Sequence, residues 1–376
     1  MMHSDGAWTI CVREITAPAS LESVWRDLQT RADASFFQSW AWIGTWLRTF
    51  PEQAHILALE LKRNGRTIAL SVLGRNTVTR NRVFAPRALL VSEAGDPEHD
   101  SLTVEHSGFL IERGQKAEAI ARAIAYLERV DFNWDELHIG GVEAADAEVY
   151  LRSAQAAGLI PIVRSNYPYF YVDLAHLREH SLDYLSTLSA NTRQQVRRSM
   201  RLYERHDGAL MLQVAHSRAQ ALEFFAALRA VHQESWRKRG QPGAFVNERL
   251  VEFHRSLIEA SFDHGEVQIV RVSAGGHDFG YLYNFLLDGV VSNYQTGFRY
   301  SDDGRLKPGL VSHVLAIEHS VAAGCRVYDF LTGDQRYKRS LAKNESTMQW
   351  LVLRRRGFNR NLGAGMRGIA RWIVGR

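Results

Sequence analysis

The stretch that decides the fold runs from Val290 to Lys338 and reads VVSNYQTGFRYSDDGRLKPGLVSHVLAIEHSVAAGCRVYDFLTGDQRYK. It predicts an apolar strand, a turn, a helix that begins at Lys-Pro-Gly (307–309), a second strand and a polar loop. A strand that enters a helix through a tight Pro-Gly corner directs free backbone N–H groups at one point. Such a helix N-terminus is an anion site, most often for a pyrophosphate. We therefore expect a site for a phosphorylated carrier beside the polar residues that follow the second strand.

The other predicted elements form two halves of similar order, and 376 residues suggest two domains. The expected helices are 36–50, 117–129 and 149–157 in the first half, and 189–206, 219–239, 248–260 and 309–323 in the second. The expected strands are 56–60, 67–73, 136–139 and 167–172, then 267–273, 279–287, 290–296, 326–331 and 348–354. Each half reads helix, strands, helix, strand, so we predict two copies of one α/β unit, without a clear repeat in sequence.

The composition argues against a disulfide framework or a structural zinc site. Hydrophobic residues make up 45% and charged residues 23%, as in soluble globular proteins. Cys11 and Cys325 are far apart and form no CxxC motif, which fits a reducing cytosol. Residues 1–14 do not read as a signal peptide, and no run approaches the roughly 20 apolar residues that span a bilayer.

The net charge of +5 is unevenly distributed. From Leu351 onward the chain carries seven arginines and no acid, so the other 350 residues have a net charge of −2. The basic residues are concentrated in this tail and in the predicted helix 189–206. This distribution does not by itself indicate a nucleic-acid-binding protein.

Five segments of the second half resemble the GNAT superfamily, and more closely its branch of CelD and BioF2-like acetyltransferases, which is related to the two-domain FemAB peptidyltransferases. The segments are Leu188–Arg193 with the arginine-rich helix, His232–Trp236, Tyr294–Phe298, Lys307–Leu310, and Asp329–Asp334 with Tyr337 and Lys338. The match covers about residues 182–345, and the first half matches only in outline.

The resemblance implies an α/β (α+β) fold with two GNAT-like units, each a mixed, mostly antiparallel twisted sheet flanked by helices. The expected domains are a degenerate N-terminal unit (1–175), a C-terminal acyltransferase unit (176–356) and a basic tail (357–376).

The resemblance implies that the start of the helix 309–323 binds an acyl-CoA, and acetyl-CoA is the first candidate. The expected donor-binding residues are Arg305, Lys307, Pro308, Gly309 and Leu310. The usual GNAT loop has two glycines where this chain has one, with a proline inside, which leaves the identity of the acyl carrier open. The alternative is an ordinary strand-to-helix turn. We find no metal-binding motif.

Acyl transfer to an amine requires a base, an oxyanion partner and a proton donor for the thiolate. Asp334 and Lys338, spaced i and i+4, are the expected base and oxyanion partner, paired on one face of a short helix. Tyr337 and Tyr294 carry phenols that can protonate a thiolate, although Tyr294 reads more readily as core. The alternative for Asp334 and Lys338 is a surface ion pair. No GxSxG motif signals a covalent serine, so direct attack is expected.

Arginines recur every four residues, at Arg193, Arg197, Arg201 and Arg205. A row of guanidinium groups is suited to binding phosphates. We assign Arg193, Arg197 and Arg201 to acceptor binding, with a solvated helix face as the alternative. Trp236 can add to the same patch. The remaining expected acceptor-binding residues lie in the segments that carry the resemblance, and they are Gln295 and Asp329. His232, one turn before Trp236, is expected to be a packed side chain.

These features predict a cytosolic N-acyltransferase acting on an amine of a small molecule, a sugar or a polysaccharide precursor. One alternative is a FemAB-like ligase that uses aminoacyl-tRNA, the only case in which a nucleic-acid partner is expected. The other is a non-enzymatic effector of polysaccharide synthesis that binds a nucleotide through the arginines. The tail 357–376 gathers apolar residues on one helical side with arginines beside them. It is expected either to lie on the anionic inner face of the membrane or to pack on its own domain.

Overall fold

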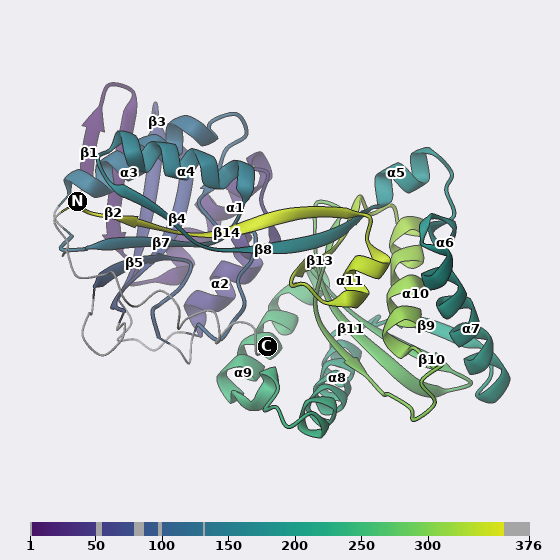
Figure 1. Ribbon diagram of the computed structural model, residues 1–376. Helices are drawn as coiled ribbons and strands as arrows, with labels where there is room; N and C mark the ends of the chain where they lie inside the picture. The colour runs from purple at the N-terminus through teal and green to yellow at the C-terminus, as the bar shows by residue number, and fades with distance from the viewer. Residues whose placement is uncertain (1, 50–54, 79–85, 97–99, 131, 357–376) are drawn as a thin grey trace. The chain divides into compact units, whose positions relative to one another are not determined.

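The computed structural model describes residues 2–49, 55–78, 86–96, 100–130 and 132–356 (Figure 1). The chain divides into two compact units, the first containing Met1–Asn166 and the chain from Thr347 onward, the second Tyr167–Ser346. This division differs from the expected boundary at residue 175 and from a second domain that runs to residue 356. The difference arises because one long strand carries the chain from the first unit into the second and another carries it back. The tail 357–376 lies outside the described residues.

The first unit contains a mixed sheet in the order β1-β2-β3-β4-β5-β7-β14, with β6 paired to β4. All neighbours are antiparallel except β5 and β7, which are parallel. Its strands are β1 (Met2–Asp5), β2 (Trp8–Glu14), β3 (Ile56–Arg63), β4 (Arg66–Thr77), β5 (Arg87–Val91), β6 (Leu110–Ile111), β7 (Glu136–Glu143) and β14 (Asn344–Arg354). Its helices are α1 (Glu22–Arg31), α2 (Trp40–Arg48), α3 (Lys116–Arg129) and α4 (Ala144–Ala156).

The second unit contains a mixed sheet in the order β8-β13-β12-β11-β10-β9. Here only β12 and β13 are parallel. Its strands are β8 (Ile160–Asp173), β9 (Leu210–Val214), β10 (Val267–Ala274), β11 (His277–Leu287), β12 (Val290–Phe298) and β13 (Val327–Thr332). Its helices are α5 (Leu174–Glu179), α6 (Tyr184–Thr187), α7 (Ala190–His206), α8 (Arg218–Lys238), α9 (Glu248–Ser261), α10 (Pro308–Ala322) and α11 (Arg336–Leu341).

The two units repeat one plan. Each has four antiparallel strands, β2–β5 in the first unit and β9–β12 in the second, with two helices after the first of the four. A helix and a parallel strand come next, and an antiparallel strand completes the sheet. The parallel ladders are equally short: Ala88–Leu90 pairs with Glu136–His138 in the first unit, and Val290–Ser292 with Val327–Asp329 in the second. The final strand of each sheet comes from the other half of the chain, β14 in the first unit and β8 in the second. The predicted fold class is confirmed.

Helices α8 and α10 cover opposite faces of the second sheet. Phe298 on β12 faces α10, where its ring lies 5.9 Å from that of His313. The preceding residue, Gly297, faces α8, because successive residues of a strand point to opposite sides. A Cβ atom at Gly297 would lie 2.7 Å from the backbone oxygen of Leu228 on α8. The absence of a side chain therefore lets α8 approach the middle of β12.

We predict that Gly297→Ala lowers the free energy of unfolding by roughly 1–3 kcal/mol, because α8 has to move away from β12. Gly304→Ala is the matched control, since nothing lies within 4 Å of a Cβ atom there. Urea unfolding of both variants measures the difference. Equal stability of Gly297→Ala and wild type would contradict the close approach of α8.

Candidate active site

The candidate site of the second unit is the opening between β12 and β13. Their parallel ladder ends at Ser292 and Asp329, yet β12 continues to Phe298 and β13 to Thr332, all within the described residues. A register shift between β11 and β12 leaves Tyr294 as an extra residue in β12. Such a bulge bends a strand and re-aims its side chains. Beyond Ser292, β12 does not pair with β13, so its backbone groups there can face a ligand, apart from the Thr296 carbonyl, which lies 3.0 Å from His232 Nδ1.

A buried lysine holds the end of β13 on the other side of this opening. Lys338 on α11 is 5% exposed, and its Nζ donates to the carbonyl oxygens of Leu331 at 3.1 Å and Thr332 at 2.5 Å. Leu331 has a φ of 61°, a left-handed conformation that is rare for a non-glycine residue. The carboxylate of Asp329, 4% exposed, accepts a hydrogen bond from the N–H of Leu331 at 2.7 Å. Asp329 and Lys338 thus stabilise the turn that takes β13 away from β12.

A histidine and two tyrosines form the wall between α10, β13 and α11. His313 is fully buried, and its Nδ1 lies 3.1 Å from the hydroxyl of Tyr328. The Tyr337 ring stacks on the His313 ring at 5.3 Å and 14°. Burial, helped by the Lys338 ammonium, lowers the pKa of His313 to about 3, so the imidazole is neutral at pH 7. Burial raises the pKa of Tyr337 far above its ordinary value, so this phenol stays protonated at neutral pH.

The predicted donor site lies at the start of α10. Lys307 is the N-cap residue and makes no side-chain cap, while its N–H donates to Ser199 Oγ on α7 at 2.9 Å. Pro308 has no N–H, so the amides of Gly309 and Leu310 are the ones that the first turn leaves for an anion. Arg305 lies apart from this group. Its guanidinium forks onto the Asp303 carboxylate, with N–O distances of 2.7 to 3.1 Å.

Asp334 does not pair with Lys338 as expected. The helix α11 begins at Arg336, so Asp334 precedes it and the i, i+4 spacing does not apply. Asp334 is exposed and accepts a hydrogen bond from Arg339 Nε at 2.5 Å, which lowers the pKa of the Asp334 carboxyl. The catalytic roles of Asp334 and Lys338 stay predictions, but the two side chains have different environments, one in solvent and one in the core.

Tyr294 on β12 packs against α9, and Trp236 belongs to α8. The Tyr294 ring is 5.1 Å from the His254 ring and 4.8 Å from that of Phe285, so Tyr294 is partly core, as the sequence suggested. Trp236 is half-buried with its ring 5.7 Å from that of His232, which is itself buried and packed. Gln295 follows Tyr294 on the same strand and is half-buried.

The arginine row of α7 separates into two parts. Arg193 donates to the carbonyl oxygens of Ser186 and Leu188 at 3.0 and 3.2 Å, so it fastens the turn before the helix. Arg197 and Arg201 are exposed and make no ion pair with the described residues. Only these two members of the predicted acceptor-binding row therefore present free guanidinium groups.

The matching region of the first unit is filled by its own chain. Beyond the β5–β7 ladder, the N–H of Ser107 donates to the carbonyl of Gly141 on β7 at 2.8 Å. A Cβ atom at Gly141 would lie 3.1 Å from the Cα atom of Glu105, so the loop 104–108 runs against this strand. Among the described residues, loop 104–108 therefore occupies the edge of β7 beyond the β5–β7 ladder.

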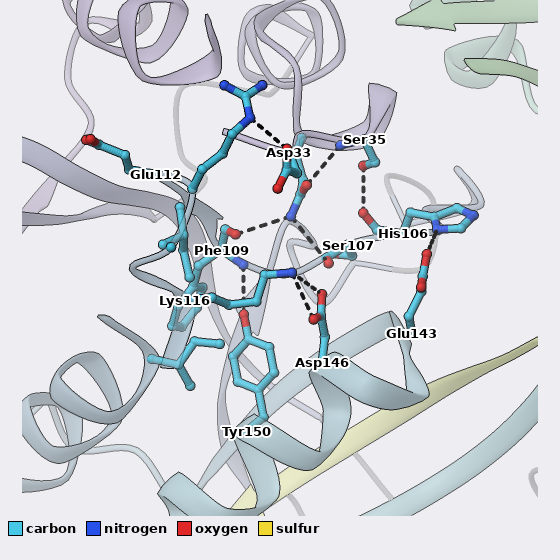
Figure 2. A pocket seen from close by; sticks show the side chains of 15 residues that line it. Asp33, Ser35, His106, Ser107, Phe109, Glu112, Lys116, Glu143, Asp146 and Tyr150 are labelled. Carbon is cyan, nitrogen blue, oxygen red and sulfur yellow. Dashed lines mark hydrogen bonds and ion pairs between the residues drawn. The ribbon is translucent and has the colours of Figure 1, made fainter. Parts of the chain in front are cut away.

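A cavity of about 250 Å³ remains in the first unit, and its charged groups pair with one another (Figure 2). Lys116 Nζ lies 2.8 Å from both carboxylate oxygens of Asp146, and Arg113 Nε lies 2.7 Å from Asp33. The Tyr150 hydroxyl accepts the N–H of Phe109 at 2.9 Å. This internal pairing leaves the cavity without a free cation for an anionic donor among the described residues that line it.

Comparison with known proteins finds a family match in the second unit. The family described as an acetyltransferase (GNAT) domain matches residues 190–339. This segment is a GNAT-type acetyltransferase domain. It contains the start of α10, the bulge of β12 and Lys338, and it ends within α11. No curated protein matches the chain by sequence.

Solved structures share the fold over almost the whole chain. FemX is 10% identical with a TM-score of 0.58, covering 90% of this chain and 96% of its own. L-PGS from Bacillus licheniformis is 13% identical with a TM-score of 0.55, covering 96% and 98%. A conserved protein of unknown function from Bacteroides thetaiotaomicron is 11% identical with a TM-score of 0.53, covering 92% and 100%. At these identities the likeness concerns the fold.

Sequence reasoning missed three parts of the site: Ser199, His313 and the left-handed backbone of Leu331. Ser199 and His313 had a usable signal, because each is a polar residue at a position that the helical period assigns to the buried face. Leu331 had none, because leucine has no preference for positive φ. No group of metal-binding side chains occurs in the described part of the chain, and no described helix is long and apolar enough to cross a membrane.

We predict that Lys338→Ala costs roughly 2–4 kcal/mol of stability, because two buried carbonyls lose their donor and a cavity forms. Asp334→Asn should leave the melting temperature almost unchanged, since its partner Arg339 is a surface side chain. Thermal and urea unfolding of the two variants test this contrast. A Lys338→Ala protein as stable as wild type would show that Lys338 does not hold β13.

His313 predicts a pH-dependent stability. Its folded pKa is about 3, below the roughly 6.5 of an unfolded histidine, so below pH 6.5 only the unfolded chain takes up this proton. The contribution of neutral His313 is therefore complete above pH 6.5 and is lost as the pH falls toward 3, by up to about 1.4 kcal/mol per pH unit. His313→Gln should flatten urea-derived stability between pH 7 and pH 5, whereas exposed His277→Gln should not. Parallel pH curves for His313→Gln and wild type would refute this.

Proposed function

We propose that the chain is an N-acyltransferase that moves an acyl group from acyl-CoA, in the first place acetyl-CoA, to an amine. The observation that carries the proposal is the free edge of β12 that leads to the uncapped start of α10, inside the GNAT-type domain. An extended thioester fits along a strand edge that offers N–H and C=O groups. Its pyrophosphate then meets the amides of Gly309 and Leu310.

Direct attack needs no covalent enzyme intermediate. The amine nitrogen bonds to the thioester carbonyl carbon, the C–S bond breaks, and the sulfur leaves as a thiolate that takes up a proton. Tyr337 is the candidate proton donor, because its phenol stays protonated at neutral pH. Asp334 is the candidate acceptor for the proton that the ammonium loses. Its depressed pKa makes it a weak base but keeps it charged, so it can also hold the ammonium group electrostatically.

For the acceptor we propose an amine on a phosphate-bearing molecule, such as a sugar nucleotide or another polysaccharide precursor, as in the CelD-like branch. The exposed Arg197 and Arg201 support this class, because guanidinium groups bind phosphate in a fork. The tail 357–376 is proposed to bring the protein to an anionic membrane surface.

The same arginines favour a second candidate, a FemAB-like ligase whose donor is an aminoacyl-tRNA, since exposed arginines also bind nucleic-acid backbones. This candidate requires charged tRNA and no CoA. A non-enzymatic nucleotide-binding effector requires neither and would be indifferent to the loss of Tyr337 and Asp334.

Calorimetry with CoA tests the donor. Lys307→Ala removes a cation beside the pyrophosphate and keeps the backbone, while Gly309→Val places a side chain at the amides; each should weaken CoA binding about tenfold or more. Because a Cβ atom at 309 would lie 3.2 Å from the Phe298 ring, the melting temperature of that variant must be compared with wild type. Gly304→Val, in open space, is the control.

Unchanged CoA affinity in folded Lys307→Ala and Gly309→Val would remove the donor assignment. A wild-type protein that binds no CoA but transfers an amino acid from charged tRNA would replace the proposal with the FemAB-like candidate.

A further inference from the structure

A basic pocket lies between the start of α7 and the α11 segment of the second unit. Its volume is about 520 Å³, and all residues that line it belong to the second unit. Those that matter here are Ser189, Asn191, Thr192, Arg336, Arg339 and Lys343. The lining contains three cations and no carboxylate. We call this site the α7–α11 pocket.

The charges of the α7–α11 pocket are only partly compensated. Arg339 binds Asp334 and Glu345, with N–O distances of 2.5 and 3.1 Å. Arg336 and Lys343 are exposed, and neither forms an ion pair or a side-chain hydrogen bond with any residue that the structure describes. Two positive charges thus face the pocket without a counter-charge from the chain.

Hydrogen bonds between the walls keep the pocket in shape. The Tyr184 hydroxyl of α6 donates to the buried carbonyl of Leu341 at the end of α11 at 2.7 Å. Arg193 fastens the α6–α7 turn through the carbonyls of Ser186 and Leu188. The two sides are therefore positioned before a ligand arrives, which lowers the entropy cost of binding.

The start of α7 adds hydrogen-bond donors to these charges. Ser189 Oγ accepts the N–H of Thr192 at 3.2 Å, and the N–H of Arg193 bonds to the Ser189 carbonyl at 2.9 Å. The amides of Ala190 and Asn191 have no such partner within the first turn of this 17-residue helix. They supply directed donors where Arg336 and Lys343 supply charge.

We propose that the α7–α11 pocket binds a phosphate group of a substrate of the acyl-transfer site, which rests on the function proposed above. Phosphate monoesters carry nearly two negative charges and accept several hydrogen bonds, which matches two uncompensated cations with two free amides. Arg336 and Arg339 of α11 and Lys343, which follows the helix, line the pocket, whereas Lys338 of the same helix is buried and binds the end of β13. An α-helix with its side chains is about 10–12 Å across, so one extended molecule can reach both places.

The phosphate can belong to either substrate. CoA carries a phosphate on its ribose in addition to its pyrophosphate, and an activated sugar carries a diphosphate. The two sources are separable because 3′-dephospho-CoA lacks only the ribose phosphate. The test therefore measures CoA, 3′-dephospho-CoA and uridine diphosphate on the same variants.

The test variant carries Arg336→Gln and Lys343→Gln together in the full chain. It is compared by calorimetry at low salt with a control variant that carries Arg13→Gln and Arg255→Gln. The control removes the same two charges at exposed arginines that lie outside the pocket. Both variants should melt near the wild-type temperature, because all four side chains are exposed. In the pocket variant we expect about a tenfold or larger loss of affinity for one phosphate ligand, and the loss should shrink in high salt.

Loss confined to CoA, with 3′-dephospho-CoA bound equally by both variants, places the ribose phosphate of the donor in the pocket. Loss confined to uridine diphosphate places the phosphate of the acceptor there. Wild-type and pocket-variant proteins that bind all three ligands alike would overturn the proposal. A wild type that binds uridine diphosphate through the pocket but no CoA would refute the proposed acyl-CoA function while retaining the phosphate site.

Discussion

The hydrogen bonds from Lys338 to the carbonyls of Leu331 and Thr332 are the interaction on which the site depends. They hold β13 in a left-handed turn that its leucine would not adopt by preference, just beyond the last pair of the parallel ladder. Beyond this ladder β12 continues to Phe298 without pairing to β13. A buried ammonium is costly unless its donors are satisfied, so the lysine and the turn stabilise each other.

The two units share one plan but differ, within the described residues, in what lies beside the parallel ladder. Both sheets have a three-residue parallel ladder, and the final strand of each comes from the other half of the chain. In the first unit the loop 104–108 runs along β7 and bonds to Gly141, and the cations of the nearby cavity are paired with acids. In the second unit the start of α10 is uncapped and the cations around α11 outnumber their partners. Chemistry is therefore assigned to the second unit.

Elements with local signals could be predicted from the sequence. Helix α7 followed from its N-cap Ser189 and its buried stripe, and the β10–β12 meander from its turns and apolar runs. The exchange of β8 and β14 could not be predicted, because strands far apart in sequence pair through long-range packing that no local pattern encodes. For the site residues, the expected helix start at 307–309 agrees with α10, which begins at Pro308, while the donor role given to it stays a prediction. The expected pairing of Asp334 with Lys338 does not occur, because α11 begins two residues after Asp334.

Amide hydrogen exchange with and without CoA tests the central claim most directly, since it reports where along the chain the donor lies. The account predicts slower exchange on CoA addition in β12 beyond Ser292 and in the first turn of α10, with little change in the first unit. Protection centred on the loop 104–108 and the start of α3, with none at β12 or α10, would contradict it.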